Sequence, residues 1–469
     1  MKNNRYFMLK PSKLRHFSYG AVLIFILITL ESCQKENIDS PTSVGVSPLT
    51  REYEGEFLQD YFFLTCRIAQ TTDGFFPTQA ARAYGYIGVT AYESVVHGIE
   101  GGESLAGQLD GFEKGSLPQP NPALEYNWAL ACNAAMGQII RRSFELNLTN
   151  ENSERLYFME KDNRNLLSQN VPEDVIMRSE HFGRSVAEAI YQKSTTDGAH
   201  LAYLDPFKQS EAIPNDEYCW VPTGANAVPL SPNWDKTRSF IPNIAEDSQP
   251  IPHLAFSKET NSEFYQQAMD VYTQVTQNNT EEEITIAKYW ADDPFQTCTP
   301  AGHTFNITTQ LLQESNATLE KTAVGLGMMA VAENDAFISC WKSKYDYVLI
   351  RPVSYIQRYI DSDFQTVIGT PPFPAYISGH SAEIGAGIKV LIELFADENG
   401  NYEFTDLSQI QYGFEARQYD NFYDMAAECA LSRYYGGIHF EMDNTNGLDV
   451  GYAVGDAVLT KINWPKNIQ

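Results

Sequence analysis

A proline-rich stretch interrupts a sequence that otherwise has helical periodicity almost throughout. Eight prolines fall between residues 204 and 259, together with Trp220, Trp234 and Phe240. On either side, apolar residues recur at spacings of three and four, which is typical of amphipathic helices, and strand-like alternation is scarce. Loops of this length are uncommon inside a compact protein, so we expect the stretch to wrap over the helices with its aromatic side chains docked on them.

These patterns predict an all-α protein made of two packed helical bundles with a long Pro-rich loop. We expect an N-terminal bundle at residues 51–203, the loop at 204–260 and a C-terminal bundle at 261–469. A content of 43% hydrophobic and 13% aromatic residues is that of a globular chain. In the C-terminal part the periodicity predicts helices at 261–277, 281–291, 304–341, 382–395, 412–435 and 440–460.

The first 33 residues (1–33) have the pattern of an export signal. Five basic residues precede the apolar run Ala21–Leu30, which is short for a bilayer-spanning helix. The run ends at Leu30-Glu31-Ser32-Cys33, which resembles a bacterial lipobox, where the cysteine is acylated and becomes the mature N-terminus. We therefore expect an exported protein, periplasmic or anchored to the outer membrane as a lipoprotein through Cys33, with residues 34–50 as a flexible tether. An uncleaved signal anchor is the alternative.

The net charge of the chain is strongly negative. There are 33 Lys and Arg residues against 60 Asp and Glu residues, giving a formal charge of −27. Such an excess repels anionic polymers, so nucleic acid is not an expected partner. An anion that binds this chain must be small and held by local cations.

The cysteines carry no metal or redox signature. Besides Cys33 there are six, widely spaced and without a C-x-x-C pair, so neither a zinc ribbon nor a thioredoxin-type centre is supported. Disulfides and plain buried thiols remain equally open. These six are Cys66, Cys132, Cys219, Cys298, Cys340 and Cys429.

The first group of polar residues contains two cations, Lys344 and Arg351, shortly before Pro352. If the segment is helical, Trp341, Lys344 and Arg351 lie on one face, because three and seven residues are close to one and two turns. Pro352 disfavours helical backbone at Arg351, so we expect the helix to end there. The apolar neighbours make the segment at least half buried, and buried cations need a partner. A solvated basic face is the alternative.

A second polar group, Ser378-Gly379-His380, follows several prolines and precedes the apolar face of residues 382–395. This position at a helix N-terminus, with free N–H groups and the helix dipole, favours an anion. Gly379 permits close approach, Ser378 offers a hydroxyl, and His380 can transfer a proton near neutral pH. An ordinary serine N-cap followed by a surface histidine is the alternative.

The third group contains Ser432-Arg433, His439 and Asp443. Gly436 and Gly437 predict a helix end, with a new helix starting near His439. His439 and Asp443 then lie four residues apart on one face. The carboxylate can accept the proton of one ring nitrogen and leave the other nitrogen free as a ligand or nucleophile.

Together the three groups resemble the vanadium-dependent haloperoxidases and their relatives in the type 2 phosphatidic acid phosphatase superfamily. The signature K-x6-R-P, S-G-H and S-R-x5-H-x3-D is complete here. Ile377 stands where the family usually has a proline, at a position that shapes the turn. Looser similarity to exported bacterial haloperoxidases extends the resemblance to about residues 55–460, and it implies the helical haloperoxidase fold.

The resemblance to the haloperoxidases implies that the chain uses vanadate as cofactor. It would then oxidise halide with hydrogen peroxide to a hypohalous species. His439, oriented by Asp443, would bond to vanadium, and His380 would take a proton from peroxide. Lys344 would polarise the bound peroxide, and the product could react with a small organic acceptor. The vanadate oxygens would be held by Lys344, Arg351, Ser378, Gly379 and Arg433.

The alternative branch is an exported acid phosphatase. There His439 attacks phosphorus to form a phosphohistidine, Arg433 stabilises the developing charge, and His380 protonates the leaving oxygen. Because vanadate and phosphate share shape and charge, phosphate can compete for the same cage.

Two aromatic residues favour the haloperoxidase branch. Trp341 and Phe373 fall where the haloperoxidases carry aromatics beside vanadate, whereas the plain phosphatases generally lack that tryptophan. Such a pocket wall would exclude water and contact a soft halide, although core packing is the ordinary role of both residue types. Phe373 stands where algal bromoperoxidases tend to have a histidine, which points to iodide or bromide as substrate.

A third interpretation is a lipoprotein that captures phosphate or vanadate without turnover. Loss of His380 or Asp443 would indicate it, and both are present. Asp292, Asp293 and His303 could lie behind the basic cluster and support it.

Overall fold

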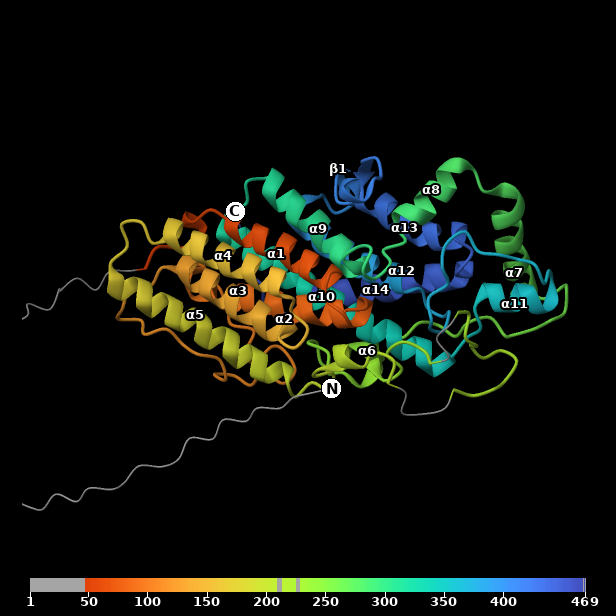
Figure 1. Ribbon diagram of the computed structural model, residues 1–469, viewed down its shortest axis with the longest axis horizontal. Helices are drawn as coiled ribbons and strands as arrows, with labels where there is room; N and C mark the ends of the chain where they lie inside the picture. The colour runs from red at the N-terminus through yellow and green to blue at the C-terminus, as the bar shows by residue number, and fades with distance from the viewer. Residues whose placement is uncertain (1–46, 209–212, 225–227, 467, 469) are drawn as a thin grey trace, which may run out of the picture. The chain divides into compact units, whose positions relative to one another are not determined.

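Helix α10 (Leu319–Tyr347) forms the centre of the fold. The computed structural model describes residues 47–208, 213–224, 228–466 and 468. Within them α10 is the longest helix, and nearly every residue from Leu319 to Trp341 is buried. A helix that is apolar around its whole circumference has to be covered on all sides. Helices α2, α9, α12 and α14 supply this cover (Figure 1).

The other elements surround this core. Helix α3 packs against α2, α4 and α5, and α14 packs along α12. The bounds, apart from short 3-10 turns and the π-helical segment Gln274–Asn278, are α1 (Glu56–Gln70), α2 (Pro77–Glu93), α3 (Trp128–Phe144), α4 (Asn150–Leu167), α5 (Glu173–Ser194), α6 (Ile244–Asp247), α7 (Glu263–Thr273), α8 (Glu281–Tyr289), α9 (Thr299–Glu314), α11 (Pro352–Tyr359), α12 (Gly379–Phe395), β1 (Asn401–Asp406), β2 (Arg417–Asn421), α13 (Phe422–Tyr435) and α14 (Glu441–Lys461).

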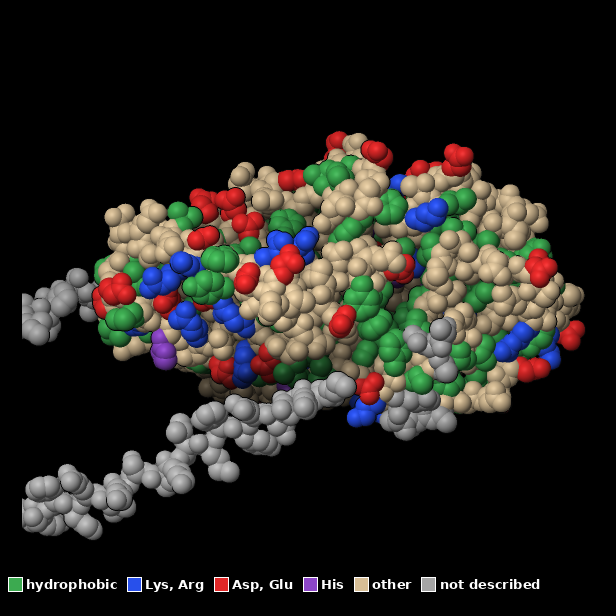
Figure 2. Space-filling view, viewed as in Figure 1, with side chains coloured by type: hydrophobic (Ala, Val, Ile, Leu, Met, Phe, Trp, Pro, Cys, Tyr) green, Lys and Arg blue, Asp and Glu red, His purple; other side chains and the backbone are tan. Residues whose placement is uncertain are grey.

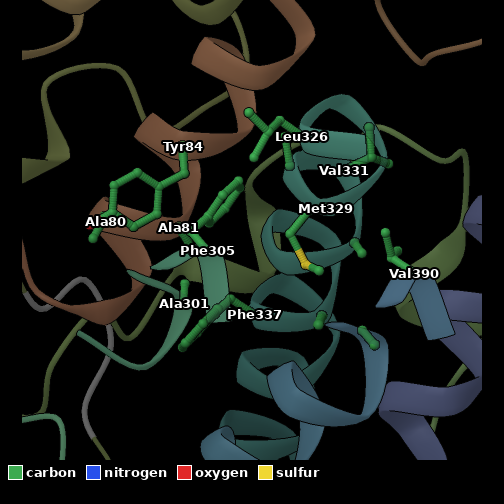
Figure 3. Close-up of a cluster of buried hydrophobic side chains, with 14 of the residues drawn as sticks. Ala80, Ala81, Tyr84, Ala301, Phe305, Leu326, Met329, Val331, Phe337 and Val390 are labelled. Carbon is green, nitrogen blue, oxygen red and sulfur yellow. The ribbon is translucent and has the colours of Figure 1, made fainter. Parts of the chain in front are cut away.

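The core contains aromatic and small side chains from helices on both sides of the proline-rich loop. Figure 3 shows Tyr84 of α2, Phe305 of α9 and Leu326 and Met329 of α10 in one cluster. The rings of Tyr84 and Phe305 lie 5.2 Å apart between centroids. The all-α prediction is confirmed. The division at residues 203 and 261 stays a prediction, because the described residues fall within one compact unit.

The proline-rich loop lies against the helices, as predicted. Trp220, Trp234 and Phe240 are all buried, at 4%, 4% and 2% exposure. Both carboxylate oxygens of Asp335, in α10, accept hydrogen bonds of 2.8 Å from the backbone N–H groups of Phe240 and Ile241. The loop is therefore held to the central helix by a buried side chain as well as by apolar contact.

Two predicted helices are wrong in their extent. The helix expected at 304–341 is two helices, α9 and α10, separated by a turn in which Asn316 has a φ of 49°. The helix expected at 412–435 begins only at Phe422, because residues 417–421 form strand β2, which pairs antiparallel with β1. The side chain of Asn421 caps α13 by accepting from the N–H of Tyr423, at 2.7 Å.

Most charged side chains lie on the outside, apart from buried ones such as Asp335 and Lys344. On the face shown in Figure 2, Lys and Arg side chains lie among Asp and Glu side chains. Over α3 to α5 they form pairs such as Arg164 with Glu180, at 2.6 Å. No described helix is long and apolar enough to cross a membrane. The predicted signal segment 1–33 and most of the tether 34–50 lie outside the described residues.

Candidate active site

Lys344 lies in the last turn of α10 and is completely buried. Its ammonium group donates to the backbone carbonyls of Pro374 at 2.9 Å, Ala375 at 3.0 Å and Ile377 at 2.5 Å. Three acceptors match the three donors of an ammonium group and offset part of the cost of burying it. Lys344 thus fixes the loop that leads into α12 and places a positive charge against it.

Arg351 is not on the helix that carries Lys344, contrary to the prediction of a shared face. Helix α10 ends at Tyr347, and Val348 reverses the chain with a φ of 50°. Arg351 has extended backbone and is the N-cap of α11, which starts at Pro352. The expectation that Pro352 would exclude Arg351 from a helix is therefore confirmed, but the two cations meet through tertiary structure.

The Arg351 guanidinium joins three segments of the site. Its Nε donates to the carbonyl of Phe373 at 2.8 Å, and its Nη1 donates to the carbonyl of Ile438 at 2.9 Å. Nη1 also lies 3.0 Å from Nε2 of His439. Nη2 has no hydrogen-bond partner among the described residues, so one buried donor remains available.

The Arg351 contact decides the tautomer of His439. A guanidinium only donates, so Nε2 of His439 must accept and carries a lone pair. The ring proton is therefore on Nδ1, which donates to Oδ2 of Asp443 at 2.8 Å. Burial and the charge of Arg351 lower the pKa of His439 well below its usual value. His439 is thus a neutral imidazole with its Nε2 lone pair directed at the cations.

Asp443 holds this imidazole from the start of α14. The N-cap of α14 is Phe440, so His439 lies just outside the helix, and the prediction of two residues on one helical face is wrong in that detail. Oδ2 of Asp443 also accepts from the N–H of Phe440 at 3.0 Å. Burial raises the pKa of Asp443 to about 7, against the opposing charge of Lys344.

Ser378, Gly379 and His380 begin α12. Ser378 is the N-cap, and its hydroxyl accepts from the N–H of Ser381 at 3.4 Å. The N–H of Ser378 donates to the backbone carbonyl of Asp443 at 2.9 Å, which links α12 to α14. A methyl group on Gly379 would contact only Trp341, at 3.6 Å. The space beside Gly379 is therefore open to a group that approaches the helix N-terminus.

His380 and Arg433 both contact Trp290. Nη1 of Arg433 donates to the carbonyl of Trp290, and Nε of Arg433 has no partner among the described residues. Nε2 of His380 is also buried without a partner in the described part of the chain. Burial, followed by the charge of Arg433, lowers the pKa of His380 well below its usual value. His380 is therefore neutral and able to accept a proton.

Trp341 and Phe373 form an aromatic wall next to the cations. Their ring centroids are 5.0 Å apart. The centroid of Phe373 is also 5.0 Å from Nζ of Lys344 and 5.0 Å from Cζ of Arg351. Contacts of this length between a cation and a ring face are attractive. The proline-rich loop supports the wall, because Nε1 of Trp341 donates to the carbonyl of Leu230 at 3.3 Å.

A second buried polar cluster lies behind Arg433. Nδ1 of His303 is 2.9 Å from Asp292, and Nε2 is 3.0 Å from Asp406. Burial alone would lower the pKa of His303, but the two carboxylates raise it well above its usual value. The ring of Trp290 stacks on His303 with centroids 4.4 Å apart. His303 thus packs against the residue whose carbonyl binds Arg433.

Sequence reasoning named Asp292, Asp293 and His303 for this position. It missed Asp406 and also Gln409, whose side-chain amide donates to Oδ1 of Asp292 at 2.9 Å. The charges of Asp292 and Asp293 oppose the effect of burial, which lowers the pKa of Arg433. Asp406 ends strand β1, which was not predicted. No signal in the sequence pointed to Asp406, because neither the strand nor its approach to His303 was predicted.

The site has the donors that a tetrahedral oxyanion requires. Arg351 contacts Nε2 of His439, the charges of Lys344 and Arg433 also act on this imidazole, and the N–H of Ser378, next to Gly379, donates to the carbonyl of Asp443. Within the described residues, Lys344, Arg351 and Arg433 form no direct ion pair, so their charge is not cancelled locally. The arrangement can bind a small oxyanion, bond to its centre through Nε2 and transfer a proton through His380.

The chain is similar to known haloperoxidases. A family model for the VCPO second helical-bundle domain matches residues 326–465. The solved structure of the first bacterial vanadium-dependent iodoperoxidase has 31% sequence identity and a TM-score of 0.79, with 87% of this chain and 97% of that chain covered. No curated protein matches the sequence.

Two structures of a bacterial vanadium-dependent chloroperoxidase are also similar. The holo form has 13% identity and a TM-score of 0.60, covering 83% of this chain and 92% of that chain. The apo form has 14% identity and a TM-score of 0.57, covering 81% and 93%. At these identities the likeness shows the fold alone.

Proposed function

The chain belongs to the vanadium-dependent haloperoxidases, which oxidise halides with hydrogen peroxide, and we propose that its preferred halide is iodide or bromide and that the residues around His439 perform the reaction. The single observation that carries this proposal is the Nε2 lone pair of His439. It is fixed by Asp443 on one side and surrounded by buried cations with unused donors on the other.

Vanadate fits the donor set of this site. The free donors of Arg351 and Arg433 and the space beside Gly379 suit the oxygens of a tetrahedral anion, and Nε2 of His439 suits its central atom. The hydroxyl of Ser378, the N–H of Gly379 and the charge of Lys344 complete the proposed cage. When bound, vanadate supplies the Lewis-acidic centre at which peroxide becomes reactive toward halide.

His380 is the proposed proton acceptor. Its Nε2 is buried without a partner in the described residues, and its lowered pKa keeps it neutral before peroxide enters. An anion bound beside Arg433 offsets the charge that lowers this pKa, which makes His380 a stronger base for the proton of hydrogen peroxide. Lys344 and Arg433 then stabilise the negative charge that remains on oxygen. Both cations are already held in place by backbone carbonyls, so little reorganisation is needed during the reaction.

The aromatic wall would select the halide. Trp341 and Phe373 exclude water from one side of the site and offer weakly polar contacts, which suit large, polarisable halides. The similar iodoperoxidase supports iodide in particular. Phe373→His, which introduces the residue of the algal bromoperoxidases, is expected to raise the ratio of bromide to iodide turnover. An unchanged ratio would show that Phe373 does not set the preference.

The direct test is halide oxidation by the purified protein with orthovanadate. Iodide or bromide should be oxidised in the presence of peroxide, with chloride oxidised least. His439→Ala should abolish the activity, whereas His181→Ala, an exposed histidine in α5, should retain it. Phosphomonoester hydrolysis without halide oxidation would instead support the phosphatase alternative. Phosphate should inhibit by competing with vanadate.

We also propose that the chain is exported and acylated at Cys33, and that its hypohalous product reacts with small organic acceptors. The support for export is the basic segment followed by the apolar run and the lipobox-like residues. Mass spectrometry of the mature N-terminus tests acylation, with Cys33→Ser as the control. A mature chain that begins elsewhere would exclude the lipid anchor.

A further inference from the structure

Two of the six cysteines described by the structure lie together although they are far apart in sequence. Cys66 is in α1, and Cys298 is the N-cap of α9. Sγ of Cys66 donates to the carbonyl of Gly302 at 3.7 Å, and Sγ of Cys298 lies 2.8 Å from the place that a methyl group on Gly302 would occupy. Both sulfur atoms therefore lie beside Gly302, which has no side chain to separate them. The interaction with Cys66, followed by burial, raises the pKa of the Cys298 thiol well above its usual value.

Neighbouring groups hold both thiols in place. The hydroxyl of Tyr84 donates to the carbonyl of Cys298 at 3.0 Å, and Tyr84 packs on Phe305 in the core cluster of Figure 3. The amide of Asn306 donates to Sγ of Cys298 at 3.2 Å. These bonds fix the start of α9 relative to α1 and α2, so the approach of the sulfurs does not depend on a mobile loop.

Cys66 borders a cavity that a small molecule can enter, whereas Cys298 is not part of its wall, and both residues are only 3% exposed. A cavity of about 360 Å³ lies beside α1 and α9, and Cys66 and Asn306 are both in its wall. The rim includes exposed charged side chains, among them Asp60 and Arg67, so the cavity opens to solvent. The oxidant that this enzyme family makes is a small molecule of only a few atoms, well below the volume of the cavity.

We propose that Cys66 and Cys298 are a redox-active pair that the enzyme's own hypohalous product converts to a disulfide. The proposal rests on the haloperoxidase function. The Cys66 thiol takes the halogen from hypohalous acid, forming a sulfur–halogen bond and releasing water. The Cys298 thiol then attacks that sulfur, the sulfur–sulfur bond forms, and halide leaves together with the thiol proton. Two thiols are oxidised by two electrons, and the halogen is reduced to halide.

The product would tie α1 to the beginning of α9. To form the cross-link, the two sulfurs, which both lie beside Gly302, must come together to a bond of about 2.05 Å. The cross-link would close a very long loop of the chain, and cross-links of that kind restrict the unfolded state most strongly. Oxidised protein should therefore have a higher unfolding temperature than reduced protein.

The test starts from reduced, desalted protein loaded with vanadate. After turnover with iodide and peroxide, followed through triiodide absorbance, the protein is denatured, alkylated without reductant, digested and analysed by mass spectrometry. A peptide pair joined through Cys66 and Cys298, with loss of two hydrogen atoms, is expected. Cys132, which is buried in α3, is the internal control and should remain alkylated. Cys298→Ser should form no such peptide pair and should lose the rise in unfolding temperature.

A second arm separates this proposal from the assigned activity. Reduced protein is treated with hypoiodous acid prepared without enzyme. Formation of the cross-link in this arm supports the thiol pair even if the protein itself produces no triiodide. The proposal is overturned if Cys66 and Cys298 are alkylated separately, either after sustained triiodide production or after treatment with the added hypoiodous acid. Oxidation of Cys66 to a sulfonic acid without the cross-link would also overturn it.

Discussion

Replacing Asp443 separates two effects of its carboxylate. One is its negative charge near the bound anion, and the other is its effect on the basicity of His439. Asp443→Asn keeps the size of the side chain and an oxygen that can still accept from Nδ1 of His439 and the N–H of Phe440. Above the Asp443 pKa of about 7, where the carboxyl is ionised, the substitution removes one negative charge close to the bound anion. On Coulomb grounds alone, phosphate and vanadate should both bind more tightly to the variant.

Vanadate has a further requirement that phosphate lacks, namely a bond to Nε2 of His439. The hydrogen bond of 2.8 Å from Nδ1 to the carboxylate raises the basicity of Nε2. Replacing a charged acceptor with a neutral one costs roughly 1–1.5 kcal/mol, the difference between charge-assisted and neutral hydrogen bonds. The Coulomb change is common to the two isosteric anions and cancels in their ratio. The preference for vanadate over phosphate should therefore fall about tenfold, with a range of 10–100-fold for such partners.

Isothermal titration of the protein with orthovanadate and with phosphate measures this ratio directly. Asp449→Asn removes the same charge from an exposed position on α14 and should leave the ratio unchanged. Circular dichroism checks that both variants are folded. If Asp443→Asn changes both affinities by the same factor, the carboxylate acts only through its charge, and the argument that it tunes His439 is refuted.

Two further predictions concern other parts of the site. Gly379→Ala should leave the unfolding temperature almost unchanged, because the added methyl group meets only Trp341, at 3.6 Å. The methyl group fills the open space, so titration should show that vanadate binding weakens at least tenfold. Burial raises the pKa of Glu383 from about 4.5 to about 8, so between these pH values the folded protein holds a proton that the unfolded chain releases. Stability should fall as pH rises, by up to about 1.4 kcal/mol per pH unit. Glu383→Gln should reduce this dependence in denaturant titrations at pH 5 and pH 8, while Glu333, whose pKa burial also raises well above its usual value, keeps its own contribution. Parallel curves for both proteins would contradict the prediction.

The sequence predicts those parts of the site that depend on local chain geometry. Ser378 and Gly379 follow prolines and precede an apolar face, so a helix N-terminus there needs no tertiary information. The contact of His439 with Asp443 also forms over four residues, although the helix starts between them. In both cases a short spacing in the chain is enough to fix the relative position of the groups.

The parts that could not be predicted depend on distant segments. The direction of Arg351 is set by carbonyls of Phe373 and Ile438, which are 22 and 87 residues away. Asp406 reaches His303 only because an unpredicted hairpin places β1 beside α9. No periodicity in the sequence encodes such contacts, because each depends on how the complete core packs.

The buried cations donate mainly to backbone carbonyls, which explains how an acidic protein keeps a positively charged site. Lys344 is held by three backbone carbonyls, Arg351 by two carbonyls and an imidazole, and Arg433 by one carbonyl. Carbonyl dipoles satisfy donors without cancelling charge, as a paired carboxylate would. Burial accordingly lowers the pKa of Lys344 to about 7 and that of Arg351 to about 9. A bound oxyanion reverses this effect, so anion binding and full protonation of Lys344 support each other, whereas Arg351 is protonated at neutral pH in either case. The excess acidic residues do not oppose this, because charges on the outer surface are screened by solvent and salt, whereas the buried groups interact at short range.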